Sequence, residues 1–139
     1  MIDITTEDEL SKYMMQIEQY KEQIDQYEYQ AQYIQAAIND YNKAKLTLEQ
    51  IKDIGKNEDM LIPIGGGTFI SVKSDDVKNV LTDIGSGLVM QKKSQDGIKN
   101  IEKRIEALQK TYQKITETIQ GLQNEANAIN EKAQEIASK

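Results

Sequence analysis

The sequence predicts a mainly α-helical protein, folded as one long antiparallel coiled-coil hairpin with two β-hairpins between its helices. Three observations lead to this fold. Apolar residues recur in alternating steps of three and four toward each end of the chain. The two series cover residues 10–48 and 98–136, so the two helices would match in length. Between them lie short β-branched segments that are separated by glycines.

The first apolar series predicts a helix over about residues 6–54. A mean step of 3.5 residues keeps a narrow a/d seam on one side of a helix. Thr6 and Glu9 fit a capping box at its beginning, and Gly55 is expected to end it in a left-handed conformation. The seam positions are Leu10, Tyr13, Ile17, Tyr20, Ile24, Tyr27, Ala31, Ile34, Ile38, Tyr41, Lys45 and Leu48.

The second series predicts a helix over about residues 94–138, with Ser94 or Asp96 as its N-cap. Gly121 lies inside this helix on its outer face, where a glycine costs about 1 kcal/mol relative to alanine. The seam positions are Ile98, Ile101, Ile105, Leu108, Tyr112, Ile115, Ile119, Leu122, Ala126, Ile129, Ala133 and Ile136.

The two series favour pairing within one chain. With Leu10 opposite Ile136, the residue numbers of paired seam positions add to 146. This register sets Tyr20 opposite Ala126, and large side chains that face small ones fill the space between helices well. The spacing of the series alone did not require that match.

Residues 60–92 predict two β-hairpins. In each hairpin, two aliphatic and β-branched runs are joined by a glycine turn, because glycine permits the positive φ that tight reversals require. Pro63 removes one ladder donor and marks its strand as an edge strand or a bulged one. The turn glycines are Gly65, Gly66, Gly67, Gly85 and Gly87.

These hairpins predict association with other subunits. Consecutive apolar residues such as Leu61 and Ile62 point to opposite faces of a strand, and one coiled-coil end covers only one face. Strands of other subunits, joined in an intersubunit β-barrel, would cover the rest and remove the exposed edges. A small self-contained cap on the helix ends is the alternative. The strand residues expected to make the contacts are Leu61, Ile62, Ile64, Phe69, Ile70, Val72, Val80, Leu81, Ile84, Leu88, Val89 and Met90.

The composition argues against several classes of protein. With 38% hydrophobic and 29% charged residues, the chain suits a thin, solvated shape. It contains neither cysteine nor histidine, which removes thiol chemistry and the commonest general base and metal ligand. A net charge of −6 argues against a nucleic-acid partner. Apolar runs are too short for a membrane span and the N-terminus is acidic, so a cytoplasmic protein without membrane contact is expected.

No motif points to catalysis. The glycine run that ends in Thr68 lacks the Lys-Ser/Thr that follows the last glycine of a phosphate loop, and it joins two strands. The carboxylates form no clustered pair in an apolar setting, so we expect no catalytic residue, cofactor or metal. An enzyme is therefore the least expected class.

Apolar residues near both chain ends are candidates for binding other proteins. Methionine is flexible and polarisable, which suits surfaces that accept many partners. Frayed ends without a function are the alternative. The candidate residues are Ile2, Ile4, Leu10, Met14, Met15, Ile129 and Ile136.

The segments Leu-Ile-Pro-Ile-Gly-Gly-Gly-Thr-Phe-Ile-Ser-Val (61–72) and Val-Leu-Thr-Asp-Ile-Gly-Ser-Gly-Leu-Val-Met-Gln-Lys-Lys (80–93) lie between the two predicted helices. In this arrangement the chain resembles the alpha subunit of archaeal prefoldin over essentially its whole length. The two hairpins are typical of the alpha class, since beta-class subunits carry one. The resemblance implies a hexamer of two alpha and four beta subunits, with residues 60–92 in its β-barrel body.

The resemblance also implies a function. Prefoldin coiled-coil tips hold unfolded proteins without ATP and pass them to a group II chaperonin in the cytosol. Two other interpretations remain open at this point. The chain could be a structural or scaffold coiled coil, or a filament-forming prefoldin relative that assembles with itself.

Overall fold

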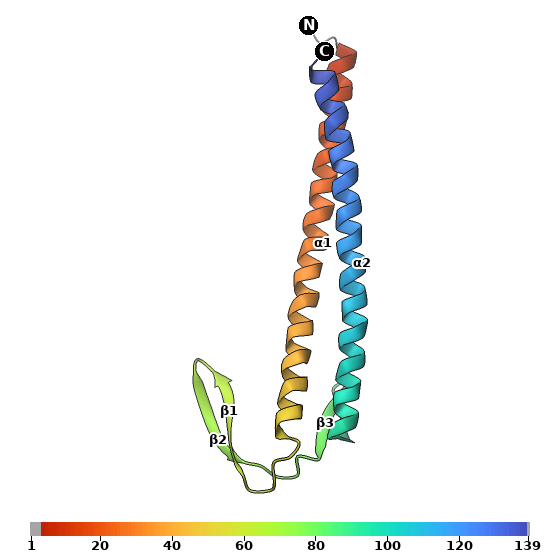
Figure 1. Ribbon diagram of the computed structural model, residues 1–139. Coiled ribbons are helices and arrows are strands. Elements are labelled where there is room, and N and C mark those ends of the chain that lie inside the picture. Colours follow the sequence, from red (N-terminus) through yellow and green to blue (C-terminus); the bar gives the residue numbers. More distant parts are fainter. Residues whose placement is uncertain (1–3, 139) are drawn as a thin grey trace. The chain divides into compact units, whose positions relative to one another are not determined.

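The computed structural model describes residues 4–138, apart from the side chain of Ile4. In chain order, the elements are α1 (Ile4–Ile51), β1 (Asp59–Gly65), β2 (Thr68–Lys73), β3 (Asn79–Gly85), β4 (Leu88–Lys93) and α2 (Ser94–Ala137) (Figure 1). Two long helices that flank two antiparallel hairpins confirm the predicted fold class. The intersubunit barrel stays a prediction, since a single chain does not contain it.

The chain divides into two compact units. The terminal unit contains the chain up to Ala37 and from Leu108 onward, and the hairpin unit contains Ile38–Ala107. Within each unit, a segment of α1 lies beside a segment of α2 and runs in the opposite direction (Figure 1). No helix within residues 4–138 is long and apolar enough to cross a membrane.

The predicted seam is where the helices bury their side chains. All twelve predicted positions on each helix are buried or half-buried, which confirms the periodic pattern residue by residue. In the terminal unit Ala31, Ile115 and Ala133 are buried, and in the hairpin unit Ile38 and Ile105 are. No side chain in the described part of the chain is less than 2% exposed, so the core is a single line of contacts.

Contacts between the helices agree with the predicted register. Lys45, the charged seam residue, is half-buried and forms an ion pair with Glu102 at 3.3 Å. In the terminal unit the Tyr20 hydroxyl donates to the carboxylate of Glu125, and this hydrogen bond raises the pKa of Tyr20. The residue numbers of these pairs add to 147 and 145, each within one of the predicted 146.

The helix ends differ from the sequence prediction. Helix α1 begins at Ile4, so Thr6 lies inside the first turn and not at the N-cap position that the sequence predicted. Its last residue is Ile51, and Gly55 does not take the left-handed conformation; Asn57 takes it instead, with φ 63°. Asparagine tolerates this conformation better than most residues because its short polar side chain can bond locally. The Asn57 N–H donates to the Ser74 carbonyl oxygen at 2.8 Å, so the chain turns at Asn57 where it meets the end of the first hairpin.

The two hairpins are separate two-stranded sheets, β1–β2 and β3–β4. In the first, Ile62 pairs with Ile70, and the ladder shifts by one residue between Pro63 and Gly65. Pro63, which has no N–H to donate, borders this bulge, so its strand is a bulged one, as the sequence allowed. The turn glycines all have positive φ: Gly65, Gly66, Gly67, Gly85 and Gly87.

The second hairpin repeats the first at an offset of 20 residues, as the strand starts Asp59 and Asn79 show. The bulge recurs, between Asp83 and Gly85. Ser86, with φ 54°, takes the left-handed place that Gly66 has in the first turn. The two hairpins are therefore one structural unit used twice.

Strand β3 packs against the beginning of α2 at Gly97. A Cβ atom on Gly97 would lie 2.8 Å from Cγ2 of Val80, so this helix position has room only for glycine. Gly121 is the second glycine of α2, and a Cβ there would meet no atom within 4 Å. Gly97 thus allows β3 to approach α2 closely, whereas Gly121 lies at an open position of the helix surface.

We expect Gly121→Ala to raise the free energy of unfolding, by up to about 1 kcal/mol, because alanine favours the helix and the site is open. Gly97→Ala should lower it, since overpacking costs about 1–3 kcal/mol and the branched Val80 side chain turns with difficulty. Denaturant unfolding of the two variants checks this. Val80→Ala should rescue Gly97→Ala. Equal stabilisation by both alanines would contradict the close packing of β3 on α2.

Candidate functional site

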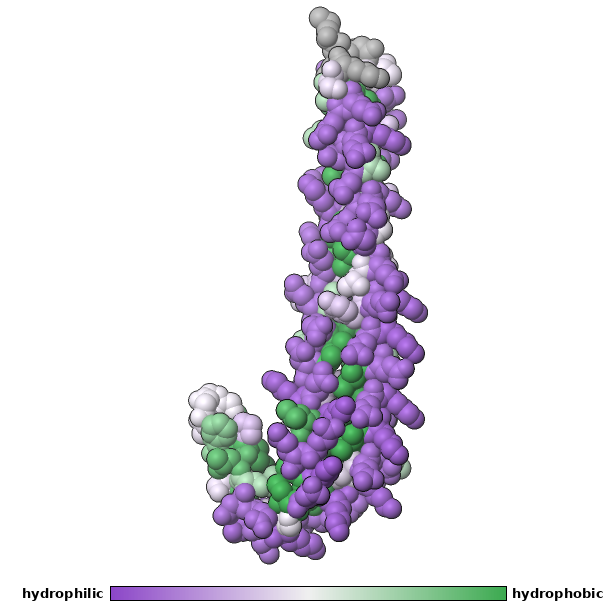
Figure 2. All heavy atoms as spheres, viewed as in Figure 1, coloured by the Kyte–Doolittle hydropathy of each residue, from purple (hydrophilic) through white to green (hydrophobic). Residues whose placement is uncertain are grey.

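The hairpins carry most of the exposed large apolar side chains. Ten of the fifteen exposed large apolar or aromatic side chains in the described part of the chain lie on them. In Figure 2, hydrophobic atoms follow the line between the helices and gather again on the β1–β2 hairpin. Of the predicted contact residues, Val72 and Val80 are half-buried. The exposed ones are Leu61, Ile62, Ile64, Phe69, Ile70, Leu81, Ile84, Leu88, Val89 and Met90.

The first hairpin is apolar on both faces. The cross-strand partners Ile62 and Ile70 share one face and are 45% and 48% exposed. Leu61 and Phe69 belong to the opposite face and are 67% and 56% exposed. An isolated two-stranded ribbon is marginal in water, and within this chain all four side chains keep a large exposed surface. The arrangement therefore fits a surface that other polypeptide chains cover.

Two buried serines anchor the bases of the hairpins. The Ser74 hydroxyl donates to the Gly55 carbonyl oxygen at 2.6 Å and accepts from the Glu58 N–H at 2.9 Å. The Ser94 hydroxyl donates to the Val77 carbonyl oxygen at 2.5 Å. Each hydroxyl thus connects the residues that follow a hairpin to the residues that precede it.

Sequence reasoning missed the role of both serines. From the sequence, Ser94 was expected to cap a helix and Ser74 was given no role. A signal was present, because the pairs Lys73-Ser74 and Lys93-Ser94 are identical and 20 residues apart. The repeated dipeptide, read together with the repeated glycine turns, would have marked the two serines as equivalent.

Asp76 shapes the connector between the hairpins. Its carboxylate accepts from the backbone N–H of Lys78 at 3.0 Å and from the side-chain amide of Asn79 at 2.7 Å. The hydrogen bond from the Lys78 backbone has the largest effect on the pKa of Asp76, and together with the bond from Asn79 it holds that pKa below its ordinary value. The carboxylate therefore acts as a turn residue in this connector.

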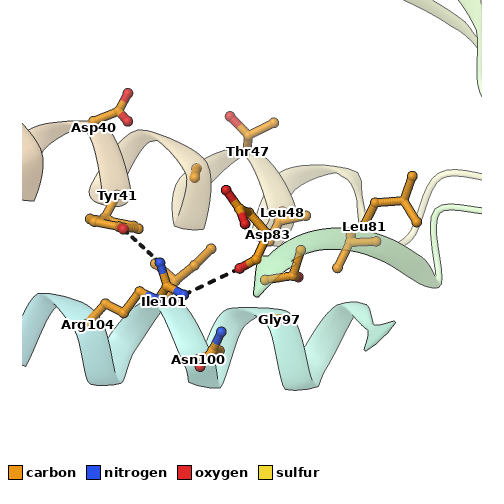
Figure 3. Close-up of a pocket in the computed structure, with 13 residues that line it drawn as sticks. Asp40, Tyr41, Thr47, Leu48, Leu81, Asp83, Gly97, Asn100, Ile101 and Arg104 are labelled. Atoms are coloured by element: carbon orange, nitrogen blue, oxygen red, sulfur yellow. Dashed lines mark hydrogen bonds between the residues drawn. The ribbon is translucent and has the colours of Figure 1, made fainter. Parts of the chain in front are cut away.

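A groove of about 590 Å³ lies between α1, α2 and β3 in the hairpin unit (Figure 3). Arg104 spans it, donating to the Tyr41 hydroxyl at 3.0 Å and to the Asp83 carbonyl oxygen at 3.4 Å. Its guanidinium carbon lies 5.8 Å from the centre of the Tyr41 ring. Arg104 thus connects both helices to β3, which is a structural role. Within residues 4–138, no three carboxylates come together to hold a metal ion.

The predicted tip residues fall into three groups. Met14 and Met15 are 59% and 65% exposed. Leu10, Ile129 and Ile136 are half-buried in the seam, so much of their surface is already used. The side chain of Ile4 and the whole of Ile2 lie outside the described residues. Among the described candidates, only the two methionines are largely free for contact with another protein.

Comparisons with known proteins agree with this architecture. A family model described as "Prefoldin subunit" matches residues 20–139. The chain is 32% identical to prefoldin subunit alpha of Archaeoglobus fulgidus over 101 residues, 73% of this chain and 72% of the relative. It is 30% identical to prefoldin subunit alpha of Methanococcus aeolicus over 131 residues, 91% of this chain and 89% of the relative.

The fold also matches a solved structure. It is similar, with a TM-score of 0.61 and 20% sequence identity, to filamentous PFD from Methanocaldococcus jannaschii, covering 88% of this chain and 96% of that one. Long paired helices around two apolar hairpins define a coiled-coil subunit of an oligomer. The chain belongs to the prefoldin family, and the relatives described above are alpha subunits, which confirms the resemblance noted from the sequence. Membership supports a chaperone role and assembly with other prefoldin subunits.

The serine anchors can be tested by substitution. Ser74→Ala should lower the free energy of unfolding by about 1–3 kcal/mol, because it leaves buried backbone groups without a partner. Hydrogen exchange of the Glu58 amide, which donates to the Ser74 hydroxyl, should become faster. Ser71→Ala, at an exposed position of β2, is the matched control and should change neither quantity. Unchanged exchange at Glu58 in Ser74→Ala would contradict the anchoring role.

Proposed function

We propose that this chain is the alpha-type subunit of an ATP-independent holdase. It captures unfolded proteins at its coiled-coil tip and delivers them to a group II chaperonin in the cytoplasm. The single observation that carries the capture step is the exposure of Met14 and Met15, adjacent methionines that the seam leaves uncovered. The family of the chain supports the rest of the proposal, because prefoldin is a chaperone family and not a family of enzymes.

The hairpins are proposed to build the body of the assembly. Strands of this chain pair with strands of other prefoldin subunits in an intersubunit β-barrel, in a hexamer of two alpha and four beta subunits. The support is the exposure of apolar residues on both faces of the β1–β2 hairpin. A barrel removes strand edges and covers both faces of the strands that enter it.

Holding without ATP follows from the chemistry of such tips. A methionine contact is weak and adaptable, because the thioether side chain is flexible and polarisable. Once a client is bound by one tip, the other tips around the cavity meet it at a high effective concentration, so further weak contacts form readily. The client is then held tightly as a whole and released contact by contact, without a nucleotide-driven step.

A second candidate is a self-assembling prefoldin relative that forms filaments without client transfer. The solved filamentous PFD of similar fold favours it. Native mass spectrometry of the chain alone and with a prefoldin beta subunit separates the two. A heterohexamer with two copies of this chain supports the alpha-subunit proposal. A homo-oligomer that does not bind the beta subunit supports the filament. An oligomer that does not suppress aggregation of a denatured test protein, measured by light scattering, supports a scaffold.

We expect the double substitution Met14→Gln, Met15→Gln to weaken suppression of aggregation of a chemically denatured client by the assembled protein. Glutamine keeps a good helix former at both positions and removes the apolar contact. Light scattering of the client during dilution from denaturant is the measurement, and native mass spectrometry should show that the assembly persists.

Leu46→Gln is the matched control for this variant. Leu46 is 55% exposed on the same helix α1, but it belongs to the hairpin unit and not to the terminal unit. Its substitution should leave the suppression of aggregation unchanged. An equal loss in both variants would show that exposed apolar surface anywhere on α1 suffices, and the tip assignment would be wrong.

A further inference from the structure

Helix α1 has a second aromatic face that the seam does not use. Tyr29 and Tyr33 are 72% and 75% exposed, the highest values among the large apolar and aromatic side chains of the described helices. They are four residues apart, so they lie one above the other on one side of the helix. Helix α2 has no exposed large apolar side chain in its described part. The aromatic face is thus particular to α1.

The stretch of α1 that carries these tyrosines is acidic. From residue 22 to residue 37, helix α1 contains Glu22, Asp25 and Glu28 and neither lysine nor arginine. A shallow hollow beside Tyr29 is lined by Asp25 together with two glutamines, Gln26 and Gln30. A carboxylate and an aromatic ring therefore border the same hollow, and a cation is the ligand that complements both groups.

The same helix already shows which cation suits such a tyrosine. The Arg104 guanidinium lies over the Tyr41 ring and donates a hydrogen bond to its hydroxyl. Guanidinium is planar and more weakly hydrated than ammonium, so it stacks on aromatic rings more readily than lysine does. Arg104 is the only arginine in the sequence and is engaged in this contact, so a second copy of the chain has no free arginine to offer.

We propose that Tyr29, Tyr33 and Asp25 form a contact surface for arginine side chains of an extended, non-native polypeptide. We name these three residues the arginine surface. The guanidinium covers a tyrosine ring while its N–H groups donate to the Asp25 carboxylate. The inference rests on the proposed holdase function and extends it, because the arms then favour arginine-containing segments in addition to apolar ones.

The test uses two fluorescein-labelled, Gly/Ser-rich peptides of equal length and charge, one with evenly spaced arginines and one with lysines at the same positions. Fluorescence anisotropy measures the Kd of each for the assembled full-length protein at low salt and at about 0.15 M salt. We expect tighter binding of the arginine peptide. Tyr29→Gln should weaken it about two- to fivefold, as a cation–aromatic contact at an exposed site predicts.

Two matched comparisons decide the outcome. Asp25→Asn and Glu28→Gln remove the same charge from the same stretch of α1, but only Asp25 borders the hollow. Asp25→Asn should therefore weaken the arginine peptide more than Glu28→Gln. An unchanged preference for arginine over lysine in the double variant Tyr29→Gln, Tyr33→Gln would overturn the proposal, as would equal losses in the two charge variants.

The test also separates this inference from the holdase proposal. If the wild-type assembly suppresses aggregation but shows no preference for arginine, the arginine surface is wrong and the holdase proposal stands. If the preference is present and depends on Tyr29 and Tyr33 while aggregation is not suppressed, the surface stands and the holdase proposal fails.

Discussion

The narrow seam between α1 and α2 is the constraint on which the rest of the molecule depends. Two helices that pair along a 3.5-residue repeat can bury one stripe of each and no more. The consequence is visible in the burial, since five apolar residues form the buried set in the described chain and none is fully enclosed. Apolar side chains that lie outside the seam and are exposed in this chain must be covered by another polypeptide or remain in water.

This constraint gives meaning to the apolar residues that lie outside the seam. On the hairpins they occupy both faces of a two-stranded ribbon, where no single helix pair could cover them. On α1 they are Met14, Met15, Leu46 and the tyrosines of the arginine surface, whereas the described part of α2 has none. The two helices therefore divide their roles. Helix α2 serves the seam, and α1 serves the seam and also presents exposed contact positions.

The periodic features could be predicted from the sequence because they depend on local spacing. A seam position is fixed by its place in the repeat, so even Lys45 was placed correctly, although its partner Glu102 was not foreseen. The turn glycines were predictable for the same local reason. The serine anchors and Gly97 were not, because a hydroxyl bonded 17 or 19 residues away and a Cβ facing Val80 depend on the folded arrangement.

For the candidate tip residues, the sequence repeat gave the seam positions, but only the structure gave the exposure of each side chain. The seam pattern already contained Leu10, Ile129 and Ile136, and the structure shows that they are half-buried in the seam. Met14 and Met15 stay predicted contact residues because the seam leaves them exposed. The strand residues likewise stay predictions for the intersubunit barrel, since one chain contains only half of each proposed contact.

Hydrogen exchange of the hairpin amides, measured with and without a prefoldin beta subunit, tests the central claim that other subunits cover the hairpins. The account predicts that amides at residues 59–73 and 79–93 exchange rapidly in the isolated chain and slowly in the mixture. Amides near Met14 and Met15 should exchange equally in both samples. Unchanged exchange in the hairpins of a mixture that does assemble would contradict the account, because the subunits would then be joined by another surface.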